Sequence, residues 1–348
     1  MIDVLFPIHI NRWSNPISSK FREIILNSSV KDIIYHTFSS PVTIEDFQNN
    51  NQLWYRSNIC KTSLSGLITK KFDIIHRSTA TKTNHLVDKI VQWRSLKKTY
   101  KIYTIAVEPH HEDPYYNLMK KAVERADYLV ANSKIAVETV HEHFNRKVDK
   151  VIYNGVDTEF FDPTILNKQT LFKYNIDLPY FVFNSAILPR KRPDLFIEIA
   201  RKLPNLNFVM VGRPTEFNKT YLGSLPVNVK YLGTVSKAEV RDLMGLAKTL
   251  IFTSELEGLP NAVIEAMSLG LPILAQNKSS MPELVKENNG WLVDSDNLDL
   301  WIDHVKIIHS TSETEMDQLR KTSRQQTVGL FSWHKYAANH IELYNSLI

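Results

Sequence analysis

The chain has 348 residues, of which 43% are hydrophobic and 23% are charged, as is typical of a soluble globular protein of about two domains. The net charge of +5 is modest, and no basic helix or interleaving of basic and aromatic residues indicates a nucleic-acid site. No run of about 18 apolar residues predicts a membrane span.

The N-terminal stretch "MIDVLFPIHINRW" has neither a basic leader nor a long apolar segment, so we expect no signal peptide. The single cysteine, Cys60, cannot form an internal disulfide, which favours a reducing compartment. We therefore expect a cytoplasmic protein. The excess of basic residues leans toward the first half, which allows peripheral contact with an anionic membrane.

Short apolar runs alternate with amphipathic stretches along the chain, which predicts parallel sheets covered by helices on both faces. Two such series suggest two Rossmann-like domains, with the break in the turn-rich residues 154–180. The predicted strands are residues 4–7, 33–36, 72–75, 102–106, 128–131 and 151–153 in the first half, and 181–185, 208–211, 229–232, 250–253, 272–275 and 290–293 in the second. The predicted helices include residues 117–125, 134–143, 194–203, 237–246 and a last helix from residue 333.

One predicted helix places a glutamate among apolar side chains, in the stretch "SELEGLPNAVIEAMSLGLP" at residues 254–272. Gly258 supplies the turn, Pro260 suits the first helical position, and Gly270 with Pro272 ends the helix. Apolar residues surround Glu265 on nearly every side, so the helix is expected to be buried. A buried carboxylate is costly unless it is hydrogen-bonded, so Glu265 needs a partner.

This stretch forms a strand–loop–helix corner, where open α/β folds bind ligands and where a helix start attracts anions. Glu265 lies about 7–8 Å along the axis from the helix start, at roughly 1.5 Å per residue. That spacing is close to the separation between a phosphate and the ribose of one nucleotide. Two interpretations remain open: Glu265 accepts ribose hydroxyls, or it forms an internal salt bridge or is partly exposed.

A second corner follows the predicted strand "YFVFNSAI". Arg190, Lys191 and Arg192 stand directly before a helix whose first turn contains Pro193 and Asp194. Three cations at the positive end of a helix oppose its dipole, and a bound anion would relieve that conflict. A diphosphate is the natural candidate, and a solvent-exposed run of charge is the alternative.

The stretch around Glu257 and Glu265 resembles the signature of retaining glycosyltransferases of family four, which reads Glu, seven residues, Glu. The resemblance covers roughly residues 125–348, and the first hundred residues share only the layout. Further segments that resemble the family are "ADYLVANSKIAVETV", "KVIYNGVDTEFF", "LPRKRPDLFIEIA", "VKYLGTVSKAEVRDLM", "SSMPELVKENNGWLV" and "FSWHKYAANHIELY".

The resemblance implies the α/β GT-B fold, in which two Rossmann-like domains with parallel sheets face an interdomain cleft. It implies an N-terminal acceptor-side domain at residues 1–160, a nucleotide-sugar-binding domain at 161–330, and a final helix at 331–348 that crosses back to the first domain. It further implies a hexosyltransferase of class EC 2.4 that needs no cofactor besides its substrate, a UDP- or GDP-linked sugar. The partner substrate would be a saccharide, glycoconjugate or lipid-linked acceptor, and the anomeric configuration would be retained.

The resemblance also implies roles for individual residues. Glu265 would take the ribose hydroxyls, Glu257 would contact the donor sugar or its phosphate, and Lys191 would neutralise the diphosphate. The remaining donor contacts would come from Arg190, from Gly258 and the backbone amides of Leu259, Asn261 and Ala262, and from Thr234 and Val235 beside the nucleobase.

The sequence also departs from the family pattern. Ser185 and Ala186 stand where family members carry Gly-Arg, so we hypothesise that Arg190 or Arg192 replaces the missing arginine. The Gly-Gly loop after the first strand is absent. The usual histidine after the fourth strand is unmatched, and Glu108, His110 and His111 are the nearby candidates to contact the reacting sugar.

No metal site is predicted. The "DSD" of Asp294–Asp296 imitates a metal-binding Asp-x-Asp, but it follows "GWLV" in a loop where caps are the expected role. Two other functions fit the sequence: a sugar-nucleotide epimerase of the same architecture, and a non-catalytic relative that binds a nucleotide or a partner chain.

Overall fold

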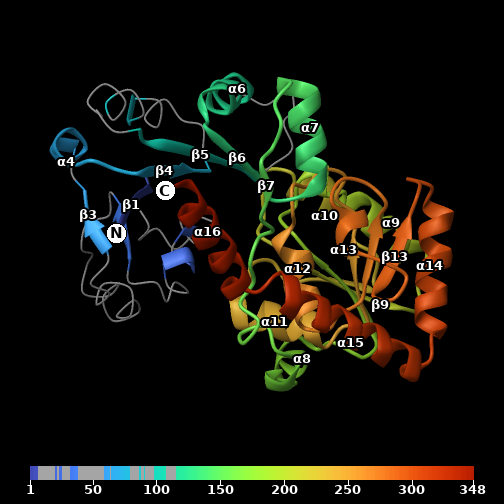
Figure 1. The fold of residues 1–348 in the computed structure, drawn as a ribbon. Coiled ribbons are helices and arrows are strands. Elements are labelled where there is room, and N and C mark those ends of the chain that lie inside the picture. Colours follow the sequence, from blue (N-terminus) through green and yellow to red (C-terminus); the bar gives the residue numbers. More distant parts are fainter. Residues whose placement is uncertain are drawn as a thin grey trace. The chain divides into compact units, whose positions relative to one another are not determined.

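The computed structural model describes residues 1–6, 20–21, 23–25, 32–37, 59–62, 64–78, 86–87, 90, 98–106 and 115–348. These residues form two compact units, which are Met1–Gly155 together with Trp333–Ile348, and Val156–Ser332 (Figure 1).

The first unit contains a seven-stranded sheet with the order β3-β2-β1-β4-β5-β6-β7. All of its pairings are parallel, as predicted. Its strands are β1 (Ile2–Phe6), β2 (Ile33–Thr37), β3 (Ile59–Lys61), β4 (Ile74–Arg77), β5 (Tyr100–Ile105), β6 (Tyr128–Ala131) and β7 (Lys150–Val151).

Successive side chains of a strand point to opposite faces, and β1 shows this clearly. Val4 and Phe6 join the core beneath the last helix, which contributes Tyr344, whereas Leu5 packs on the other face against Leu67. Among the described residues of this unit, the helices with defined bounds are α4 (Leu64–Thr69), α6 (Tyr116–Arg125), α7 (Lys134–Phe144) and α16 (Trp333–Leu347).

A buried polar joint ties α16 to this sheet. The His76 ring places Nε2 2.7 Å from the Thr104 hydroxyl and Nδ1 2.7 Å from the Tyr344 hydroxyl. The His340 ring stacks on His76 with 5.3 Å between the ring centroids. Burial lowers the pKa of His76 well below its ordinary value and lowers the pKa of His340 to about 4, so both rings are neutral near pH 7.

The second unit contains a six-stranded parallel sheet with the order β10-β9-β8-β11-β12-β13. Its strands are β8 (Tyr180–Asn184), β9 (Asn207–Val211), β10 (Val229–Tyr231), β11 (Thr249–Phe252), β12 (Ile273–Gln276) and β13 (Gly290–Val293).

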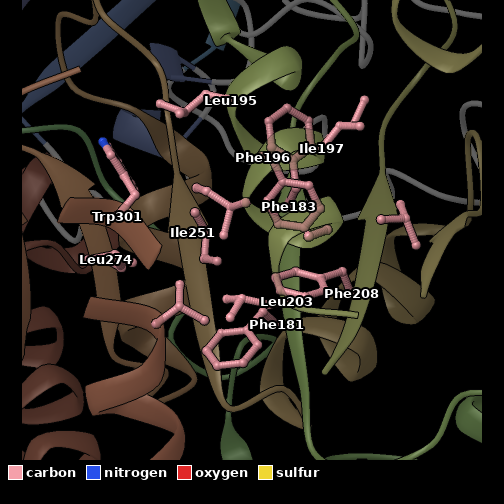
Figure 2. Close-up of a cluster of buried hydrophobic side chains, with 14 of the residues drawn as sticks. Phe181, Phe183, Leu195, Phe196, Ile197, Leu203, Phe208, Ile251, Leu274 and Trp301 are labelled. Carbon is pink, nitrogen blue, oxygen red and sulfur yellow. The ribbon is translucent and has the colours of Figure 1, made fainter. Parts of the chain in front are cut away.

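Helices cover both faces of this sheet. Phe181 and Phe183 of β8 point into a core with Phe196 and Trp301, as Figure 2 shows. Tyr180, one residue earlier, points to the other face, where its hydroxyl donates to the Leu243 carbonyl at 2.6 Å. The helices are η1 (Pro163–Ile165), α8 (Gln169–Tyr174), η2 (Pro189–Lys191), α9 (Pro193–Lys202), α10 (Asn218–Leu222), α11 (Lys237–Gly245), α12 (Asn261–Ser268), α13 (Met281–Leu284), α14 (Leu298–Ser310) and α15 (Glu313–Leu330).

The predicted strands lie within about two residues of the observed ones, and β6 and β13 match fully. Two local predictions were wrong. β3 was not predicted, and Pro260 caps α12 instead of occupying its first turn. Among the described residues, no helix is both long enough and apolar enough to cross a membrane.

Candidate functional site

The sheet of the second unit reverses its strand order between β8 and β11. The chain proceeds from β8 outward to β9 and β10, and then continues on the other side of β8 with β11, β12 and β13. Loops that follow two such neighbouring strands diverge at the carboxyl edge of the sheet and leave room for a ligand. The two corners singled out in the sequence, residues 185–192 and 253–260, are the loops at this position.

The loop after β8 is held by the end of β11. The Thr253 hydroxyl lies 2.8 Å from the Lys191 carbonyl oxygen and 2.9 Å from that of Arg192. The Glu255 amide donates to the Arg190 carbonyl at 3.2 Å. Arg192 adopts a left-handed conformation with φ 50°, and α9 begins at the next residue. These contacts fix the position of the Lys191 backbone and so of its Cα atom.

Lys191 and Glu257 form an ion pair across the two loops. Their side chains are only 12% and 14% exposed. The Glu257 oxygen that meets Lys191 also accepts from the Ser254 hydroxyl at 2.7 Å and lies 3.6 Å from the Arg190 guanidinium. Burial lowers the pKa of Lys191, and the charge of Glu257 opposes that shift. The sequence predicted both residues at the site but not their pairing.

The backbone of Glu257 has an anchor of its own. Its amide donates to the Ser279 hydroxyl at 3.0 Å, and that hydroxyl donates in turn to the Glu257 carbonyl. Ser279 follows β12 with φ 57°, a conformation that non-glycine residues adopt rarely. The sequence analysis did not identify Ser279, because no residue near it indicates that the backbone adopts a left-handed conformation at this position.

Glu265 lies in the second turn of α12 and is half-buried. Burial raises the pKa of Glu265 to about 7, and the positive charge of Lys237 opposes the rise. Lys237 itself lies over the rings of Phe160 and Phe161, 4.7 Å and 5.3 Å from their centroids. Within residues 115–348 and the other described ranges, the Glu265 carboxylate has no hydrogen-bond or ion-pair partner. It therefore has acceptor oxygens available for a hydroxyl-bearing ligand.

The far end of α12 is fixed to the rest of the unit. Arg324 of α15 donates to the Ser268 carbonyl at 2.7 Å and to the Asp162 carboxylate at 2.7 Å. Ser268 is the last residue of α12, so its C-terminal end cannot shift without breaking these bonds. The helix that carries Glu265 is therefore a rigid support.

Comparison with known proteins agrees with this geometry. Residues 168–326 match the family model described as glycosyl transferases group 1. This match covers most of the second unit, which is similar to that family. This confirms the resemblance seen in the sequence.

Two curated relatives are named as sugar transferases. One is the UDP-Gal:alpha-D-GlcNAc-diphosphoundecaprenol alpha-1,3-galactosyltransferase of Escherichia coli, 28% identical over 57% of this chain and 54% of that protein. The other is the D-inositol 3-phosphate glycosyltransferase of Mycolicibacterium smegmatis, 24% identical over 62% of this chain and 51% of that protein. The chain thus aligns with about half of the length of each relative.

The fold extends over the whole chain. The structure of Anabaena Alr3699/HepE in complex with UDP and glucose matches 99% of this chain and 100% of its own, with a TM-score of 0.76 and 16% identity. At this identity the likeness shows the fold alone. It confirms the predicted class, α/β of the GT-B type with two Rossmann-like units.

Within the second unit, the arginines before α9 differ in what they contact. Arg192 donates to Glu255 at 2.7 Å and to Asp194 at 3.0 Å, so it is engaged in holding its own turn. Arg190 is 54% exposed and lies beside Glu257. The three cations are therefore neutralised by internal carboxylates, which the sequence analysis did not foresee. Of the two arginines hypothesised to replace the missing one, Arg190 has the more exposed side chain.

The other predicted donor residues lie on the same edge of the sheet. Gly258 and Leu259 are buried before α12, whose first turn begins with the exposed Asn261 and the half-buried Ala262. Thr234 and Val235 follow β10, after Gly233 with φ 68°. Their contacts with a donor stay a prediction.

Three predicted positions lie elsewhere in the chain. Glu108, His110 and His111 are outside the described residues. They belong to the sequence-based prediction alone.

Asp294 and Asp296 act as loop ties in the second unit. Asp294 accepts from Asn277, whereas Asp296 accepts from Gln276 and lies 3.5 Å from Lys278. Among the described residues, no cluster of three or more histidine, cysteine, aspartate or glutamate side chains has the form of a metal site.

A hollow of about 840 Å³ opens in another part of the second unit, where α13, β13 and α14 meet. Lys286, Trp291 and His304 are among the residues that line it. None of the predicted donor residues does.

Proposed function

We propose that the chain transfers a sugar from a nucleotide-diphospho-sugar to a hydroxyl acceptor, with the donor held between the loops after β8 and β11. The observation that carries this proposal is the meeting of a cationic corner and the half-buried Glu265 carboxylate, which has no partner among the described residues, at the strand-order reversal of the second sheet. Sugar transferases among the relatives support it. The names of the E. coli relative and the Anabaena structure both include UDP, which favours a UDP-linked donor over a GDP-linked one.

In this proposal Lys191 and Arg190 neutralise the diphosphate as it leaves. Fixed charges in a site with little water act strongly on charge that develops during reaction. Amides of the α12 start, at Leu259, Asn261 and Ala262, complete the phosphate contacts, while Pro260 has no N–H to offer. Because protein cations supply the neutralisation, we expect activity to persist with excess EDTA.

The remaining roles follow the order of groups in the donor. Glu265 accepts hydrogen bonds from the ribose hydroxyls, which gives its half-buried carboxylate the partner it needs. Thr234 and Val235 pack beside the nucleobase. Glu257 contacts the transferred sugar. Glu108 and His110, which lie outside the described residues, stay the sequence-based candidates for a further contact with that sugar.

We propose that the reaction retains the anomeric configuration by attack on the face from which the diphosphate departs. The bond between the anomeric carbon and the phosphate oxygen breaks, and its electron pair stays on the diphosphate. The acceptor oxygen bonds to the same face, and its proton passes to the departing phosphate oxygen. Proton NMR of the first-formed product distinguishes retention from inversion.

A panel of UDP- and GDP-linked sugars tests the proposal, with saccharide, glycoconjugate and lipid-linked acceptors supplied in turn. Nucleoside diphosphate release together with a glycosylated acceptor supports transfer. An isomerised donor without acceptor consumption supports the epimerase, and binding without turnover supports a non-catalytic relative. Failure of the folded protein to bind any nucleotide sugar or nucleoside diphosphate would refute the donor site altogether.

A further inference from the structure

We propose that Glu257 is an internal stand-in for the donor phosphate, which neutralises Lys191 and Arg190 until the diphosphate displaces it. The displaced carboxylate is then free to accept hydrogen bonds from the donor sugar. This inference rests on the proposed function and adds to it an exchange of anions at Lys191.

The contact geometry supports the exchange. One Glu257 oxygen receives Lys191, the Ser254 hydroxyl at 2.7 Å, and the Arg190 guanidinium at 3.6 Å. A phosphate oxygen has the same charge and the same capacity to accept from these donors. Because Lys191 is only 12% exposed, leaving it without an anion would be costly. Glu257 supplies that anion from within the chain.

The supports of the two side chains are independent of their ion pair. Ser279 bonds both the amide and the carbonyl of Glu257. Thr253 lies against the carbonyl oxygens of Lys191 and Arg192. Rotation of the Glu257 side chain away from Lys191 therefore breaks no backbone bond in either loop. A carboxylate so mounted can leave and return at small structural cost.

The competing interpretation is a permanent structural ion pair, and the two make opposite predictions for Glu257→Gln. If the carboxylate competes with phosphate, its removal tightens binding of UDP and of inorganic pyrophosphate, by about tenfold or ~1.4 kcal/mol for UDP. If the ion pair only holds Lys191 in place, Glu257→Gln lowers the affinity for both UDP and pyrophosphate. For a UDP-sugar the exchange model predicts a smaller gain than for UDP, because the sugar loses its contact with the carboxylate.

Isothermal titration calorimetry with UDP, pyrophosphate and the accepted UDP-sugar measures these affinities. Glu255→Gln is the matched control, since Glu255 lies in the same loop and pairs with Arg192 at 2.7 Å. It should leave UDP affinity within about twofold. Lys191→Gln should lower the affinity for UDP. Adding Glu257→Gln to the Lys191→Gln variant should not raise the UDP affinity, because the effect of Glu257 acts through Lys191.

Circular dichroism establishes that each variant is folded. If Glu257→Gln does not fold, Glu257→Asp takes its place. The shorter aspartate side chain reaches Lys191 less well, so this variant should raise the affinity for UDP by a smaller factor. Weaker UDP binding in the folded Glu257 variant, with binding by the wild type intact, overturns the exchange and leaves the proposed function standing. Absence of UDP binding in the wild type overturns the proposed function itself.

Discussion

The two units differ in how the titratable side chains inside them are hydrogen-bonded. In the first unit both nitrogens of His76 lie 2.7 Å from a hydroxyl group, one from β5 and one from α16. In the second unit Glu265 has no hydrogen bond or ion pair among the described residues, and burial raises its pKa to about 7. Nε2 of the buried His340 also has no hydrogen-bond partner among the described residues, so a missing partner does not by itself indicate a ligand. Glu265 differs because it lies at the strand-order reversal of the second sheet, where open α/β folds bind ligands.

The largest effect that sharpens this contrast is expected at Glu265. Glu265→Ala should weaken UDP binding by about a hundredfold, roughly 3 kcal/mol, because hydrogen bonds to a charged acceptor are lost. The free energy of unfolding at pH 8 should change much less, since the variant also removes a half-buried unpartnered charge. Calorimetry and urea unfolding measure the two quantities. Equal UDP affinity in variant and wild type would remove Glu265 from the site.

The two regions should also respond to pH in opposite directions. Folding lowers the pKa of His76 and His340, so their contribution to stability is complete above pH 6.5 and is lost as the pH falls through 6.5 toward 4. Folding raises the pKa of Glu265 from 4.5 to about 7, so its cost appears as the pH rises through that interval.

Urea unfolding from pH 4.5 to 8 tests these signs. His340→Phe should flatten the loss of stability on the acidic side, and Glu265→Gln should raise stability at pH 8 by about 2 kcal/mol but little at pH 5. Arg324→Lys changes a residue of α15 that contacts the C-terminal end of α12, and neither arginine nor lysine titrates in this range. It is the control for the pH dependence of the free energy of unfolding. A steeper acidic loss in His340→Phe would contradict the assignment to this joint.

A smaller effect is expected from the support beneath Lys191. Thr253→Val keeps the shape of the side chain but removes the hydroxyl that lies against the Lys191 and Arg192 carbonyls. The turn that places Lys191 should loosen, and UDP affinity should fall by about tenfold, ~1.4 kcal/mol. Thr249→Val, at the start of β11 and four residues earlier in the chain, is the matched control because its buried hydroxyl has no partner among the described residues. A loss as large in the control would assign the effect to β11 in general.

The smallest effect belongs to the first unit. Tyr344→Phe removes one of the two hydroxyls at His76 and should lower the free energy of unfolding by about 1–2 kcal/mol, because a buried nitrogen loses its partner. UDP affinity per folded molecule should not change. A loss of UDP affinity without a loss of stability would mean that this joint is not merely structural.

The sequence predicted those features that depend on short-range pattern. Runs of apolar residues predicted the strands. The apolar residues that surround Glu265 predicted that most of α12 is buried. Both predictions use the spacing of apolar residues, which can be read from a short stretch of sequence. β3 was missed since its three residues, Ile59–Lys61, are too few to show a period.

The contacts across loops could not be predicted in this way. Lys191 and Glu257 were each expected near the diphosphate, but their pairing depends on β8 and β11 lying side by side in one register. The hydrogen bonds between Ser279 and the Glu257 backbone depend on the positive φ of Ser279. The sequence has no glycine at that position to indicate such a conformation. Long-range register and local backbone strain are fixed by the assembled sheet, and neither leaves a pattern in the residues themselves.

A structure of the protein bound to a UDP-sugar tests the donor site most directly. The predicted result is a diphosphate within hydrogen-bonding distance of Lys191 and at the start of α12, with both ribose hydroxyls on Glu265. A nucleotide bound elsewhere, such as in the hollow beside Trp291 and His304, with Glu265 still unbonded, would contradict it.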